Sequence, residues 1–462
     1  MRSTPGFSLL LLLALGAPFI MGNAGSQLRL KKAAREPERN GWIQVHLEGT
    51  PREIGYQHGY LLAPEIQDNL KAVSVELMHD SKRDWSYFRQ AARDVFWPRI
   101  EAEYREELTG IAEGLKARHI KLDLWDVVAL NAWLELPYYI KESEHRPAGT
   151  GDHCSAFVAT GSYTSDGRVV IAHNNWTSYS SGERWNIVFD IAPANGYRIL
   201  MDGMPGLIHS GDDFGINSAG ILITETTISE FDGFDASGIP EFVRARKAMQ
   251  YAASLDDFAR IMKEGNNGGY ANNWLVADRK TNEIGDLELG LKNVNFQRTK
   301  DGFFVGSNFP VDAKLMREET KFDPADKSSS QNARHARWLQ LMEENKGRID
   351  VAAGERFLAD HFDTFDQKDA PSERTLCGHI DLSPRGMPSW QSAYAPVGAV
   401  QNKITDAAGA GKMRFSAALG HACGRDFKAA EHLRNYPGFS WYQPILRDMD
   451  ARPWTEFQAA PR

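Results

Sequence analysis

Apolar residues from Trp42 to about Tyr139 recur mainly at helical spacing. In the segment GTPREIGYQHGYLLAPEIQDNL, the positions of Ile54, Leu61 and Ile66 predict a turn followed by a helix. Two more helical patterns follow, in YFRQAARDVFWPRIEAEYREELTGIAEGLKA and in LDLWDVVALNAWLEL. The first third of the chain is therefore expected to be mostly helical.

A polar stretch, KESEHRPAGTGDH, interrupts this pattern, and strand-like segments separated by turn residues come after it. The predicted strands lie in CSAFVATG, RVVIAHNNW, WNIVFDIAP, YRILMDGMPG, GILITETTI, NNWLVADRKTNEIGDLELG and FFVGSNFP. A helix is expected in FVRARKAMQYAASLDDFARIMKEG, and residues 320–370 again look mainly helical. This order predicts a layered α+β protein with mainly antiparallel sheets.

The amino-acid composition excludes several classes of protein. With 42% hydrophobic and 25% charged residues, the 462-residue chain is typical of a globular protein and not of a disordered or coiled-coil one. A formal net charge of −8 argues against a general nucleic-acid binder, which usually carries a basic surplus.

The N-terminus is typical of a secretory signal peptide. Arg2 is followed by an apolar run from Phe7 to Ile20 and by small residues up to Ala24. We expect residues 1–24 to be removed and the mature protein to be secreted or periplasmic, without stable membrane insertion. An uncleaved anchor is the alternative, although the apolar run is short for a membrane span.

Only three cysteines are present, Cys154, Cys377 and Cys423. For an exported protein an odd number leaves one thiol over. Cys377 and Cys423 lie in TLCGHID and LGHACGRD, where a disulfide or two unpaired structural thiols are the favoured interpretations. The alternative is a zinc site formed by the two cysteines and the two histidines of these motifs, Cys377, His379, His421 and Cys423.

Several common catalytic motifs are missing from the sequence, which contains no Gly-x-Ser-x-Gly, no HExxH and no complete P-loop. Cys154 is the remaining candidate, because it begins a predicted strand directly after the polar stretch. Its thiol could attack the carbonyl group of His153, and hydrolysis would free an α-amino group that serves as the base for the same thiol. The alternative is that Cys154 is a buried strand residue that packs as a small hydrophobic side chain and takes no part in catalysis.

The segment GDHCSAFVATG…DGRVVIAHNNW resembles the first two strands of the N-terminal-nucleophile (Ntn) hydrolases. It is most similar to the isopenicillin-N acyltransferase-like and phospholipase B-like proteins, and FGINSAGILITETTI, SNFP, TLCGHID and PVGAVQNKITD agree with them in order. The resemblance implies a four-layer αββα sandwich formed by residues 154–462, a helical propeptide-like segment over residues 25–153, and self-cleavage between His153 and Cys154.

The resemblance also implies roles for particular residues. Cys154 would be the nucleophile, and the side-chain N–H of Asn308 would help to bind the oxyanion, unless Asn308 is only a turn residue before Pro310. Polar residues in the second predicted strand become candidates beside the nucleophile, namely His173, Asn174 and Asn175. Trp176 and Thr177 stand where the acyltransferases carry an aspartate, which favours the phospholipase B-like branch.

The expected function is hydrolysis or transfer of an acyl group from an amide, through an acyl thioester on Cys154. Hydrolysis of a lipid ester is the runner-up, and a binding protein that keeps the fold without chemistry is the alternative of another class. The substrate would be a small molecule or a lipid. The resemblance implies no metal and no organic cofactor, and the sequence does not indicate an oligomeric state.

Overall fold

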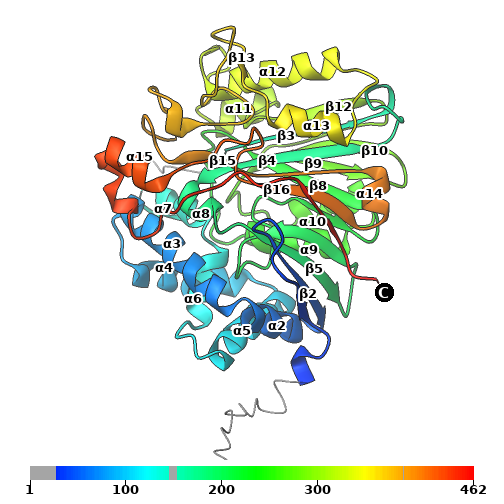
Figure 1. The fold of residues 1–462 in the computed structure, drawn as a ribbon. Helices are drawn as coiled ribbons and strands as arrows, with labels where there is room; N and C mark the ends of the chain where they lie inside the picture. Colours follow the sequence, from blue (N-terminus) through cyan, green and yellow to red (C-terminus); the bar gives the residue numbers. More distant parts are fainter. Residues whose placement is uncertain (1–27, 145–152, 389, 462) are drawn as a thin grey trace, which may run out of the picture.

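The computed structural model describes residues 28–144, 153–388 and 390–461, which form four stacked layers (Figure 1). The helices are α2 (Pro51–Leu61), α3 (Ala63–Ser81), α4 (Trp85–Ala91), α5 (Ala102–Ala117), α6 (Leu124–Asn131), α7 (Leu136–Glu144), α8 (Tyr179–Gly182), α9 (Glu241–Tyr251), α10 (Leu255–Lys263), α11 (Ala313–Glu319), α12 (Ser330–Glu344), α13 (Val351–Leu358), α14 (Ala407–Gly411) and α15 (Ala429–Asn435). Short π- or 3₁₀-helical turns are η1 (Ala92–Phe96), η2 (Trp97–Arg99), η3 (Gly161–Tyr163), η4 (Ile380–Leu382) and η5 (Pro437–Tyr442). None of the described helices is long and apolar enough to cross a membrane.

The larger sheet has nine strands in the order β1-β2-β5-β6-β7-β8-β9-β10-β11, and only β2 and β5 pair in parallel among them. Its strands are β1 (Ala34–Arg35), β2 (Ile43–Gly49), β5 (Ile187–Pro193), β6 (Ile199–Gly203), β7 (Gly215–Asn217), β8 (Ile221–Thr227), β9 (Asn272–Asp278), β10 (Glu283–Leu289) and β11 (Val294–Thr299). One face packs on the helices α2–α6, α9 and α10 through a single hydrophobic cluster. These helices form the first layer.

The smaller sheet has six antiparallel strands in the order β12-β3-β4-β15-β16-β17. They are β3 (His153–Thr160), β4 (Val170–Ser178), β12 (Gly302–Gly306), β15 (Val397–Asp406), β16 (Arg414–Leu419) and β17 (Thr455–Gln458), and a separate hairpin contains β13 (Phe362–Asp363) and β14 (Lys368–Asp369). Val158 and Ile171 face the larger sheet, while their neighbours Phe157 and Ala172 pack against α12 and α13. Both sheets are thus covered on both faces, which confirms the expected αββα sandwich.

Most predicted elements are present, but strands were missed at both ends of the chain, namely β1 and β2 near the N-terminus and β15, β16 and β17 near the C-terminus. The helical prediction for the region after Trp42 missed β2, whose alternation of Ile43, Val45 and Leu47 places these three side chains against the helices. β2 pairs with β5, so residues before Cys154 contribute a strand to the same sheet as residues after it. The division of the chain at residue 153 stays a prediction about processing, and the signal-peptide prediction lies outside the described residues.

Helices α2 and α5 approach each other closely because each carries two glycines four residues apart. A Cβ atom on Gly55 would lie 1.9 Å from the carbonyl oxygen of Glu107, and one on Gly59 would lie 2.1 Å from that of Ile111. On the partner helix, a Cβ atom on Gly114 would lie 2.4 Å from the carbonyl oxygen of Tyr56. No side chain fits at these positions without separating the helices.

We therefore expect Gly59→Ala to lower the free energy of unfolding by about 3 kcal/mol, because the added methyl group overpacks the helix contact. The midpoint of thermal unfolding measures this effect. Gly438→Ala is the control, since a Cβ atom there meets nothing within 4 Å, and its effect should stay within about 0.5 kcal/mol. Equal midpoints for the two variants would contradict the packing argument.

Candidate active site

Cys154 lies at the start of β3, between β12 and β4 in the smaller sheet. It is fully buried and pairs directly with Asn175 of β4. Ala156 and Val158 alternate with Cys154 along the strand and belong to the cluster between the two sheets. The Cys154 side chain therefore faces the larger sheet, as side chains two residues apart share a face.

Two asparagines contact Cys154. The backbone nitrogen of Cys154 donates a hydrogen bond of 3.1 Å to Asn308 Oδ1, and its Sγ lies 3.8 Å from Asn175 Oδ1. The Nδ2 group of Asn308 donates to the carbonyl oxygen of Thr227 at 2.9 Å. Asn308 thus touches the atom that would become the α-amino nitrogen, while its predicted oxyanion role stays a prediction.

The amide nitrogen of Asn175 is better placed than that of Asn308 to donate a hydrogen bond to an oxyanion. Asn175 Nδ2 is buried and has no hydrogen-bond partner among the described residues, although its oxygen faces the Cys154 thiol. Asn272 of β9 is also buried with both amide atoms unpartnered within the described parts of the chain, but it shares a face of the strand with Trp274, which packs against the helices. Buried amides are normally satisfied, so the Asn175 amide beside the thiol is suited to binding the polar atoms of a substrate.

Asn174 and His173 occupy different surroundings. Asn174 points to the other face of the sheet, where its Nδ2 donates to the carbonyl oxygens of Leu358 and Leu376, each at 3.2 Å. The structure does not bring Asn174 to the thiol, because neighbouring residues of a strand face opposite sides. His173 does face the larger sheet, and burial, reinforced by the charge of Lys403, lowers its pKa to about 3. The imidazole is therefore neutral at ordinary pH.

Glu225 was missed by the sequence analysis. One carboxylate oxygen of Glu225, one ring nitrogen of His173 and the Sγ of Cys154 lie within 4.8 Å of one another. Tyr270 donates a 2.9 Å hydrogen bond to the Glu225 carboxylate. The sequence did offer one signal for Glu225, since it is the single acidic residue of the predicted strand GILITETTI. The sequence spacing of Glu225 from Cys154, however, does not show which other strand its side chain faces.

Arg334 of α12 was also missed, and it holds the start of β3 in place. Its guanidinium donates to the Cys154 carbonyl oxygen at 2.5 Å, to Ser155 Oγ at 3.2 Å and to Asn308 Oδ1 at 2.8 Å. The same group lies 4.4 Å above the ring of Trp176. Burial lowers the pKa of Arg334, whereas the negative charge of a Cys154 thiolate raises it, so the cation and the thiolate stabilise each other.

A second buried cation, Lys403 of β15, pairs with His173 across the sheet. Its ammonium group lies 3.2 Å from Asp202 and forms an ion pair with Asp212. Attraction to both carboxylates outweighs the effect of burial and raises the pKa of Lys403. Gln401 and Lys403 of the predicted segment PVGAVQNKITD thus face the space between the sheets, where both contact Asp212.

A cavity of about 380 Å³ lies at the end of β4, just beyond the pairing of His153 with Trp176. Thr177 and Ser178 line it from the strand, and the other lining residues come from helices and loops, namely Glu76, Leu77, His79, Asp80, Lys82, Trp133, Leu134, Pro137, Trp390, Gln391 and Tyr442. It mixes apolar rings with polar groups, as small-molecule sites do.

Comparison with known proteins identifies the family to which this chain belongs. The model of the phospholipase B family matches residues 54–304, which is more than half of the chain and includes Cys154. The chain belongs to the phospholipase B family. An uncharacterized protein of Archaeoglobus fulgidus is 30% identical over 297 residues, which cover 60% of this chain and 49% of the relative.

Two relatives of this phospholipase B family chain carry functional names. Phospholipase B-like 1 of Homo sapiens is 26% identical over 49% of this chain and 47% of its own length. The acyl-coenzyme A:6-aminopenicillanic-acid-acyltransferase 40 kDa form of Emericella nidulans is 24% identical over 48% of this chain and 57% of its own length. The chain therefore spans about half the length of the curated relatives that it matches.

We expect Arg334→Leu to destabilise the protein by about 3 kcal/mol or more, because three buried acceptors at and around Cys154 lose their charged donor. The thermal midpoint should fall, and amide hydrogen exchange should accelerate in a peptide that contains residues 154–160. Arg356→Leu is the control, as the exposed Arg356 bonds a carbonyl oxygen of its own helix. Unchanged exchange in β3 would contradict the role of Arg334.

Proposed function

We propose that this chain is an exported cysteine hydrolase of the Ntn type, which cleaves itself between His153 and Cys154 and then acts on an acyl amide. One observation carries the proposal: the backbone nitrogen of Cys154 is held 3.1 Å from Asn308 Oδ1 while its thiol faces Asn175. The future amine and the thiol of one residue thus lie among buried polar groups, and the cavity at the end of β4 begins at Thr177, two residues beyond Asn175.

In the processing step, the Cys154 thiolate attacks the carbonyl carbon of His153 and displaces the Cys154 nitrogen, which takes up a proton. The product is a thioester and a free α-amino group. Water then cleaves the thioester and releases the His153 carboxylate and the Cys154 thiol. Asn175 Nδ2 is the donor best placed for the oxygen that becomes negative in both steps.

In the reaction with substrate, the free α-amino group accepts the thiol proton, and the thiolate attacks the acyl carbon. The amine delivers the proton to the leaving nitrogen, and water, deprotonated by the same amine, resolves the acyl thioester. The Arg334 guanidinium binds the same Asn308 oxygen as the amine, and a neighbouring positive charge favours the neutral, proton-accepting form of that amine.

A lipid ester is the second candidate substrate, and membership of the phospholipase B family favours it. The same acyl thioester would form, with an alcohol in place of an amine as the leaving group. A binding protein on this fold is the alternative without chemistry. Hydrolysis assays with N-acyl amino acids and with phosphatidylcholine vesicles distinguish the two chemistries.

The intact mass of the purified protein under denaturing, reducing conditions tests processing directly. The wild type should give two fragments that meet between His153 and Cys154, and Cys154→Ala should stay whole because alanine has no nucleophile. Cys154→Ser is the matched control, since its hydroxyl group permits the same acyl shift more slowly. A wild type that stays whole between pH 4 and pH 8 would contradict the proposal and favour the binding protein.

A further inference from the structure

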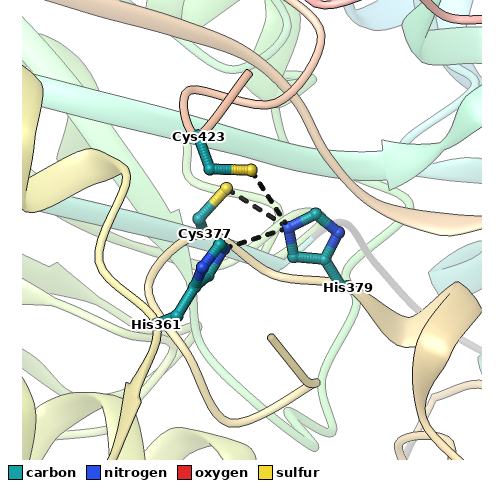
Figure 2. A group of neighbouring side chains, drawn as sticks. All are labelled: His361, Cys377, His379 and Cys423. Carbon is teal, nitrogen blue, oxygen red and sulfur yellow. Dashed lines mark hydrogen bonds between the residues drawn. The ribbon is translucent and has the colours of Figure 1, made fainter. Parts of the chain in front are cut away.

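A second cluster of reactive side chains lies on the face of the smaller sheet that is turned away from the larger sheet. Figure 2 shows its four members, two histidines and two cysteines, converging on one point: His361, Cys377, His379 and Cys423. They come from three segments far apart in sequence, which follow α13, precede η4 and follow β16. The two thiols are not joined by a disulfide.

The distances between these atoms are those of a tetrahedral metal site. His379 Nε2 lies 3.5 Å from Cys377 Sγ, 3.6 Å from Cys423 Sγ and 3.2 Å from His361 Nε2. A tetrahedral zinc ion, with bonds of about 2.3 Å to sulfur and about 2.0 Å to nitrogen, separates a sulfur and a nitrogen ligand by about 3.5 Å and two nitrogen ligands by about 3.3 Å. The three edges of the cluster that meet at His379 Nε2 agree with this geometry.

We propose that His361, Cys377, His379 and Cys423 bind a structural zinc ion. All four coordination positions are filled by protein side chains, and a closed set of this kind is typical of structural and not catalytic zinc. The proposal departs from the expectation that the chain needs no metal. It also replaces His421, the histidine suggested by the sequence motif, with His361.

The surroundings of His379 support a metal ligand. Its Nδ1 is buried without a hydrogen-bond partner among the described residues, and it lies 3.9 Å from the carboxylate of Asp381. Tyr179 donates a 2.7 Å hydrogen bond to the same carboxylate. A carboxylate on the far side of a ligating imidazole is a common partner that orients the ring.

The cluster is connected to the candidate active site through Trp176. Gly378 lies between two of the proposed ligands, and a Cβ atom on it would be 2.2 Å from the Trp176 ring. Trp176 also packs against Cys377 and Ala399, and the Arg334 guanidinium lies over its ring. A zinc ion would therefore fix the loop of Cys377 and His379, which packs against Trp176 of β4.

The test is the zinc content of the full-length protein, measured by mass spectrometry after growth in zinc-supplemented medium. We expect one equivalent per chain in the wild type and in Cys154→Ala, and loss of zinc in Cys377→Ser and in His361→Ala. His421→Ala is the matched control and should keep its zinc. Zinc retained in His361→Ala but lost in His421→Ala would overturn the proposed ligand set.

A spectroscopic measurement on the wild type covers the case in which the variants fail to fold. Cobalt exchanged into the site should give the intense visible bands of a tetrahedral ion with thiolate ligands. Absence of these bands and of zinc, or a Cys377–Cys423 disulfide found by peptide mapping, would overturn the proposal. Because zinc content is independent of processing, failure of this inference is distinguishable from failure of the proposed function.

Discussion

The guanidinium group of Arg334 connects two layers of the molecule, the helix α12 and the smaller sheet. It extends from α12 into the smaller sheet, where it binds the carbonyl oxygen of Cys154 and the side chain of Asn308. A buried arginine is costly unless its donors are satisfied, and here the acceptors lie on and beside Cys154. The location of Cys154 therefore depends on a helix about 180 residues further along the chain.

The space between the two sheets combines apolar packing with a buried polar region. Val158 and Ile171 fill one part of it, whereas His173 and Lys403 face the carboxylates of the larger sheet in another part. Charges in such surroundings interact strongly because little water screens them. Packing fixes the distance between the sheets, and the polar region contains the candidate catalytic residue His173.

The proposed zinc ion and the candidate active site share one structural support. Trp176 lies between the loop of Cys377 and His379 on one side and Arg334 on the other. Tetrahedral coordination would hold that loop by strong, directional bonds. Hydrophobic contact alone fixes the position of a loop less specifically. A metal site remote from the reacting atoms could in this way contribute to the shape of the pocket.

The sequence alone determined a layered α+β class with mainly antiparallel sheets, about half of the strands, and Cys154 as the residue at the start of β3, because alternation and turn residues are local signals. The αββα arrangement was implied by the family resemblance. The sequence did not identify Arg334 or Glu225, the close contact of α2 with α5, or His361 as the fourth member of the cluster. Each of these depends on which distant segments meet. Only the tertiary structure decides that, since spacing along a chain carries no information about contacts between residues that are far apart in it.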